Sequence, residues 1–146
     1  MIKNELIQKR GKLLEECNLI FEYLKNNKSI FIKNMEYTSR DKRDSWLPWW
    51  KATKNVDADT VILCQNPNCP NLIEFDLPGN ADGAHVKIVL PDSEEIDSIN
   101  YNAFIYPLCP KCNHPENKKV FIAESKFLLP LIIKEIEDIY KKIESI

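Results

Sequence analysis

Two short cysteine-bearing turns decide the fold of this chain: Cys64-Gln65-Asn66-Pro67-Asn68-Cys69 and Cys109-Pro110-Lys111-Cys112. A proline lies between the two thiols of each pair, and turns of this kind aim both sulfurs at one point. Two such turns supply the four thiolates that tetrahedral zinc accepts at about 2.3 Å. Four thiolates close the coordination sphere, so we expect the zinc to be structural rather than catalytic. The alternative is a set of thiols that are buried by coincidence.

Strand-like segments lie on both sides of the two turns. Six segments have the alternating or β-branched pattern that is typical of short strands: 29–37, 59–64, 72–77, 84–90, 102–108 and 119–123. The Pro- and Gly-containing run 78–83 is typical of a turn, and the acidic run 91–100 is typical of an exposed loop. The pattern predicts a core of short antiparallel strands that zinc stabilises.

Both ends of the chain have the apolar spacing of amphipathic helices. One helix is expected over about residues 1–28, with Cys17 on its buried stripe, and another over 130–146, with Pro130 at its first position. Gly11 interrupts the first pattern at a cost of about 1 kcal/mol relative to alanine. We expect a single domain in which the two apolar stripes pack on each other within one chain. Pairing across two chains, giving a dimer, is the alternative.

Three tryptophans gather in the run Trp46-Leu47-Pro48-Trp49-Trp50. Asp44 or Ser45 is a candidate N-cap for a short helix here, with Pro48 in its first turn. We interpret the rings as anchors against the core, because indole rings are more often buried than exposed. The alternative is a platform on which nucleic-acid bases stack between neighbouring basic residues.

Composition narrows the function classes. The 146 residues carry 20 basic and 22 acidic side chains, a formal charge of −2, which excludes a generally basic nucleic-acid-binding chain. Only 3 glycines are present, too few for a Gly-rich phosphate loop, so nucleotide-cofactor enzymes are disfavoured. The charged first residues do not resemble a secretory signal, and no apolar run approaches the roughly 20 residues of a membrane span. We expect a cytoplasmic protein, in whose reducing surroundings paired cysteines favour a metal over disulfides.

The run Gly83-Ala84-His85-Val86, followed by Phe104-Ile105-Tyr106-Pro107-Leu108-Cys109-Pro110-Lys111-Cys112-Asn113, resembles the HNH-type treble-clef proteins, in particular small bacterial members. In those proteins a Trp-rich segment precedes the first cysteine pair, and a closing strand follows the second. The corresponding parts of this chain span about residues 46–130. The resemblance implies a zinc-centred treble-clef (HNH-like ββα) core. Together with the flanking N- and C-terminal helices, which lie outside the matched part and are predicted from the apolar spacing, the expected fold class is α+β.

The resemblance also assigns roles to individual residues. In HNH nucleases a histidine on the first hairpin strand is the general base for an attacking water, and the match carries this role to His85. The position that holds a divalent cation falls on Asn113 and Asn117, and Asp82 offers a carboxylate beside them. Because zinc with four thiolates has no open position, hydrolysis would need a separate Mg²⁺ or Mn²⁺. We interpret the second histidine, His114, as an exposed side chain.

Three functions fit these observations. The first is a metal-dependent nuclease that hydrolyses nucleic-acid phosphodiesters with His85 as base. The second is a non-catalytic treble-clef zinc module that binds nucleic acid or a protein partner, because the set of cation ligands is incomplete. The third is an interaction protein whose outer helices mediate assembly.

Overall fold

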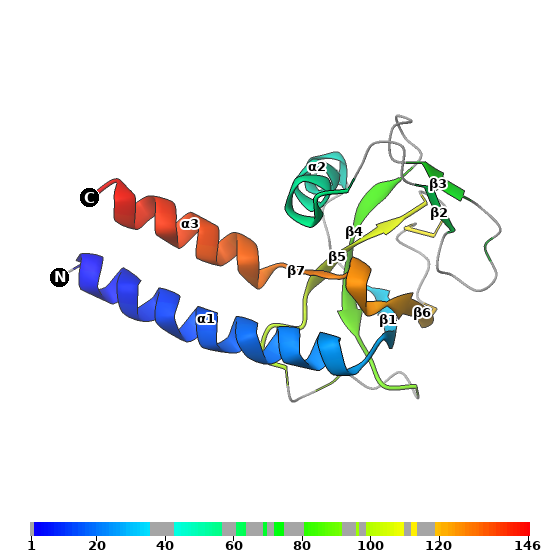
Figure 1. The fold of residues 1–146 in the computed structure, drawn as a ribbon, viewed down its shortest axis with the longest axis horizontal. Coiled ribbons are helices and arrows are strands. Elements are labelled where there is room, and N and C mark those ends of the chain that lie inside the picture. The colour runs from blue at the N-terminus through cyan, green and yellow to red at the C-terminus, as the bar shows by residue number, and fades with distance from the viewer. Residues whose placement is uncertain are drawn as a thin grey trace.

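The computed structural model describes residues 2–35, 43–56, 61–63, 69, 72–74, 81–91, 96, 99–109, 112–113 and 119–146. The described residues form an α+β fold in which helix α2 (Arg43–Lys54) packs on a five-stranded antiparallel sheet, while helices α1 (Ile2–Asn26) and α3 (Ile132–Glu144) form a pair that extends away from the sheet (Figure 1). The strand order is β6-β1-β4-β5-β7, and β2 and β3 form a separate two-stranded sheet. The strands are β1 Ser29–Asn34, β2 Val61–Leu63, β3 Leu72–Glu74, β4 Asp82–Ile88, β5 Phe104–Leu108, β6 Phe121–Glu124 and β7 Leu129–Pro130.

The centre of the sheet is the β4–β5 pair. The register places His85 opposite Ile105 and Val86 opposite Phe104. Side chains alternate between the two faces of a strand, and Ala84, Val86 and Ile88 on one face of β4 are completely buried. An apolar core therefore lies against this face of the sheet.

The prediction of a turn over residues 78–83 is wrong for its last two residues, because β4 already begins at Asp82. Asp82 pairs with Leu108 and Gly83 pairs with Pro107, so the ladder with β5 determines their conformation. Backbone pairing with a neighbouring strand overrides the local turn preference of these two residues.

The two terminal helices pack on each other. Helix α1 (Ile2–Asn26) and helix α3 (Ile132–Glu144) run side by side in opposite directions, and both chain ends lie at the same end of the pair (Figure 1). The Arg10 guanidinium of α1 lies 5.8 Å from the centre of the Tyr140 ring of α3, a contact between the two helices. Cys17 is buried in α1, as predicted, and the helix continues through Gly11. The predicted packing of the two stripes within one chain is confirmed.

Helix α2 (Arg43–Lys54) carries the three tryptophans and packs on β4 and β5. Trp50 is completely buried, and its Nε1 donates a hydrogen bond to the Phe127 carbonyl oxygen at 2.8 Å. Trp49 is half-buried, and its Nε1 donates to Glu137 of α3 at 3.3 Å. The interpretation of the tryptophan rings as anchors against the core is confirmed for Trp50.

Two prolines lie at positions other than those predicted. Helix α2 begins at Arg43, so Pro48 lies inside the helix and beyond its first turn. Pro130 belongs to strand β7, where it pairs with Phe104, and α3 begins only at Ile132. Strand β7 is one of the two edge strands of the described sheet, and an edge strand tolerates a proline that has no N–H to donate. No helix in the described part of the chain is long and apolar enough to span a membrane.

Candidate metal centre

Three of the four predicted zinc ligands lie together. The Sγ atoms of Cys69, Cys109 and Cys112 are all within 4.8 Å of one another, and the Cys69 and Cys109 sulfurs are 3.6 Å apart. Cys109 and Cys112 are buried, whereas Cys69 is half-buried. All three are free thiols. The fourth predicted ligand, Cys64, lies outside the described residues.

The sulfur spacing fits a shared metal ion. Two thiolates at about 2.3 Å from a tetrahedral ion lie about 3.8 Å apart, close to the 3.6 Å between the Cys69 and Cys109 sulfurs. A disulfide would instead bring two sulfurs to about 2.05 Å. The donor set, made of soft thiols, suits ions such as zinc. The cluster can therefore hold a metal ion.

Two side chains fix the turn that carries Cys109 and Cys112. The Asn113 backbone N–H donates to the Cys109 carbonyl oxygen at 3.1 Å, which closes the turn on itself. From β1, the Asn34 side-chain amide donates to the Cys112 carbonyl oxygen at 2.9 Å. From β4, Asp82 accepts a hydrogen bond from the Asn113 amide at 3.2 Å. The turn is thus attached to two neighbouring strands of the main sheet.

Asn34 was not identified from the sequence as part of the site. Its position does contain a signal, because Ile30 and Ile32 are buried and Asn34 continues the same alternation. A polar residue on the apolar face of a strand needs a hydrogen-bond partner. That partner, Cys112, is 78 residues away in the sequence, and only the fold identifies it.

The structure brings Asp82 and Asn113 together, two of the residues predicted to hold a catalytic cation. Asp82 is 6% exposed, and the Asn113 Nδ2 group donates to its Oδ2 atom. A hard cation would need the oxygen of the amide, whereas this contact presents the amide NH₂ group to the carboxylate. As described, the pair acts as a structural link. Asn117 and His114 lie outside the described residues.

His85 lies on the opposite face of β4 from Asp82. The two residues are three positions apart in an unbroken ladder, so their side chains project from different faces. The His85 ring meets the Trp46 ring edge to face, with centres 5.4 Å apart and planes at 73°. Helix α2 covers this face, and a Cβ atom at Gly83 would lie 2.7 Å from the Leu47 backbone nitrogen. The structure therefore does not place His85 beside the Asp82–Asn113 pair.

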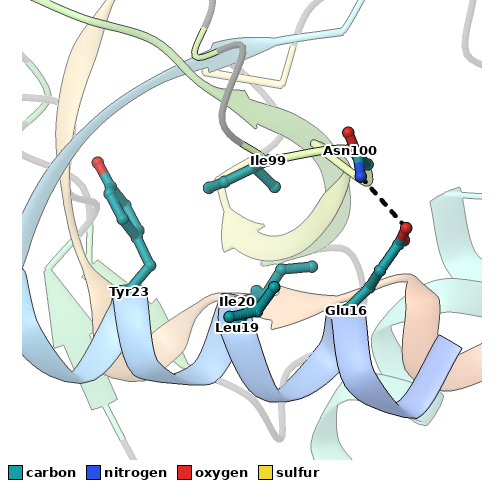
Figure 2. A pocket seen from close by; sticks show the side chains of 6 residues that line it. All are labelled: Glu16, Leu19, Ile20, Tyr23, Ile99 and Asn100. Atoms are coloured by element: carbon teal, nitrogen blue, oxygen red, sulfur yellow. Dashed lines mark hydrogen bonds between the residues drawn. The ribbon is translucent and has the colours of Figure 1, made fainter. Parts of the chain in front are cut away.

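A hollow of about 210 Å³ lies away from these residues, between α1 and residues 99–100 (Figure 2). Tyr23 lies at one end, and Glu16 and Asn100 lie at the other (Figure 2). The Asn100 amide donates to Glu16 Oε1 at 3.2 Å, while Glu16 Oε2 is buried with no hydrogen-bond partner among the described residues. Its polar end carries a carboxylate, so the hollow does not suit an anion.

Comparisons with protein-family models, with curated proteins and with solved structures found no match. We therefore infer the function from the thiol cluster, from the groups that surround it and from the charged surfaces of the chain.

Proposed function

We propose that the protein is a zinc-stabilised module with an HNH-like treble-clef core that binds nucleic acid without hydrolysing it. One observation carries the proposal: Cys69, Cys109 and Cys112 form a compact thiol cluster at the end of β5. In the proposal, Cys64 completes a tetrahedral set of four thiolates, because its spacing from Cys69 suits one metal-binding turn. The resemblance of residues 83–86 and 104–113 to HNH-type proteins supports nucleic acid as the partner.

Zinc would act by joining two parts of the fold. Cys69 lies in the connection between β2 and β3, whereas Cys109 and Cys112 follow β5 of the main sheet. An isolated two-stranded sheet is only marginally stable in water. A metal ion shared between the two parts would supply the missing stability, because in such sites the free energy of metal binding becomes free energy of folding.

A nuclease is the second candidate, and the contact between Asp82 and Asn113 is the observation in its favour. Hydrolysis would require both groups to turn oxygen atoms toward Mg²⁺ or Mn²⁺, with His85 as the general base that takes a proton from the attacking water. A general base must lie within hydrogen-bond reach of the water that it activates. His85 and Asp82 lie on opposite faces of β4, so we favour the non-catalytic module.

The test combines binding and cleavage in one experiment. Zinc-loaded protein is incubated with labelled single-stranded DNA, duplex DNA and RNA, with and without Mg²⁺ or Mn²⁺, beside a His85→Ala variant of verified zinc content. We expect binding without cleavage, and the same binding by the variant. Cleavage that requires both the divalent cation and His85 would establish the nuclease instead. Zinc-loaded protein that binds none of the nucleic acids would overturn the proposal in favour of a protein partner.

A further inference from the structure

Four lysines from distant parts of the chain gather on one surface. Lys25 lies in the last turn of α1, Lys28 follows that helix, Lys54 ends α2, and Lys126 lies in the short 3-10 helix Ser125–Phe127. They line two hollows of about 290 and 400 Å³ that share Lys28, Lys126 and a buried Ser125. We call this surface the lysine hollow.

The charge of the lysine hollow is opposite to that of the whole chain. The chain has a formal charge of −2, yet among the described residues four lysines and a single carboxylate, Glu124, line the two hollows. Glu124 pairs with Lys126 at 3.3 Å. Within the described parts of the chain, no carboxylate pairs with Lys25, Lys28 or Lys54. Positive charge is therefore concentrated in a concave place, and the ion pair with Glu124 neutralises only one of the four lysines.

The fold also holds part of this charge in place. The Lys54 Nζ atom donates a hydrogen bond to the Lys126 carbonyl oxygen at 2.9 Å, which joins α2 to the 3-10 helix. Burial lowers the pKa of Lys54, so an anion nearby would stabilise its charged form. The carbonyl ends of α1 and α2 favour cations at Lys25 and Lys54, but this effect does not account for Lys126.

An aromatic ring at the edge of the hollow points to the kind of anion. Phe21 lines the first hollow beside Lys25 and is 44% exposed. Proteins that bind single-stranded nucleic acid combine a positive groove for the backbone with exposed aromatic rings on which bases stack. A free phosphate would use the lysines but not the ring, and the bases of a duplex are already stacked on each other. Two adjoining hollows also give room for more than one phosphate.

We infer that the lysine hollow binds the phosphate backbone of single-stranded nucleic acid, with Phe21 as a stacking position for one base. This inference rests on the proposed function, because it names the surface and the strand type that the zinc-stabilised module uses. The contact needs no particular base sequence, since lysines recognise backbone phosphates as point charges. It differs from the Trp-rich platform considered from the sequence, because the completely buried Trp50 anchors α2 in the core.

The test measures the affinity of zinc-loaded protein for a labelled single strand of about 12 nucleotides by fluorescence anisotropy at several salt concentrations. The site variant is Lys28→Gln with Lys126→Gln, which leaves the half-buried Lys54 intact. The control variant is Lys9→Gln with Lys141→Gln, which removes the same charge from exposed positions on α1 and α3. Zinc content and thermal unfolding are measured for each variant, so that loss of folding is recognised.

We expect the site variant to weaken binding about tenfold and to reduce the slope of log K against log salt by about 1.4, since each phosphate contact to a single strand contributes about 0.7. The control variant should change the affinity less than about twofold, because it removes charge that lies outside the hollow. Phe21→Ala should weaken binding of the single strand but not of a duplex.

Four results would overturn the inference. Equal losses in the site and control variants would show attraction of any polyanion by overall charge. Competition by millimolar inorganic phosphate would show a site for free phosphate. A site variant that binds as tightly as the parent protein would refute the lysine hollow as the binding site and leave the proposed function standing. A parent protein that binds no nucleic acid would refute both the inference and the proposed function.

Discussion

Replacing Gly83 with alanine should weaken the docking of α2 on the sheet. The added methyl group would lie 2.7 Å from the Leu47 backbone nitrogen and 2.9 Å from the Trp46 carbonyl carbon. Both atoms belong to the helix backbone, so rotation of a side chain does not relieve the contact. Overpacking costs about 1–3 kcal/mol, and a rigid obstacle places this variant near the upper end. Unfolding entropy of about 2.1 cal/mol/K per residue converts about 3 kcal/mol into a fall in Tm of roughly 10 °C.

The assay is thermal unfolding of the zinc-loaded protein, followed by circular dichroism. The matched control is Gly11→Ala, which lies in the exposed part of α1 with no atom within 4 Å of the added Cβ. The control should raise stability by about 0.5–1 kcal/mol, because alanine favours the helix over glycine. A Gly83→Ala variant that melts within about 2 °C of the parent protein, or a control that loses as much stability, would refute the close approach of α2 to β4.

Three further predictions concern separate parts of the fold. The Asn102 side chain accepts from the Ile88 N–H at 2.7 Å and donates to the Ile88 carbonyl oxygen at 2.8 Å, so Asn102→Ala should cost about 1–3 kcal/mol in urea unfolding; an unchanged midpoint would contradict this role. Burial raises the pKa of the Cys17 thiol, so iodoacetamide should label it at neutral pH only after unfolding, and rapid labelling of the native protein, read by mass spectrometry, would contradict its burial. Acidification should release zinc, because each thiolate ligand must take up a proton; a metal-indicator dye that detects no release at pH 4 would argue against thiolate ligation.

Local sequence patterns predicted the helices and strands in which buried side chains recur at regular intervals. Helices α1 and α3 have one apolar stripe each, and strands β1 and β5 are rich in apolar or β-branched residues, so burial and sequence agree. The start of β4 at Asp82 and the strand position of Pro130 were not predictable in this way. Their conformations depend on pairing with Leu108 and Phe104, which lie more than 20 residues away.

In the candidate site, too, local spacing predicted some residues, whereas only the fold identified others. The spacing of the cysteines was enough to predict that Cys69, Cys109 and Cys112 share one cluster. Each cysteine pair is close in the sequence, and one shared metal ion accounts for the presence of two such pairs. The contact of Asn34 with Cys112 required knowledge of which strand lies beside the turn. The lysine hollow could not be predicted at all, since tertiary packing alone brings the end of α1, the end of α2 and Lys126 together.

Zinc K-edge X-ray absorption of the purified protein tests the metal centre most directly, because it reports the identity, number and distance of the ligand atoms. The parent protein should contain one zinc per chain, surrounded by four sulfur atoms at about 2.3 Å. Cys112→Ser should lose this signal, whereas Cys17→Ser, at a thiol buried in α1 outside the cluster, should keep it. Protein without zinc, or zinc surrounded mainly by oxygen and nitrogen, would contradict the four-thiolate centre.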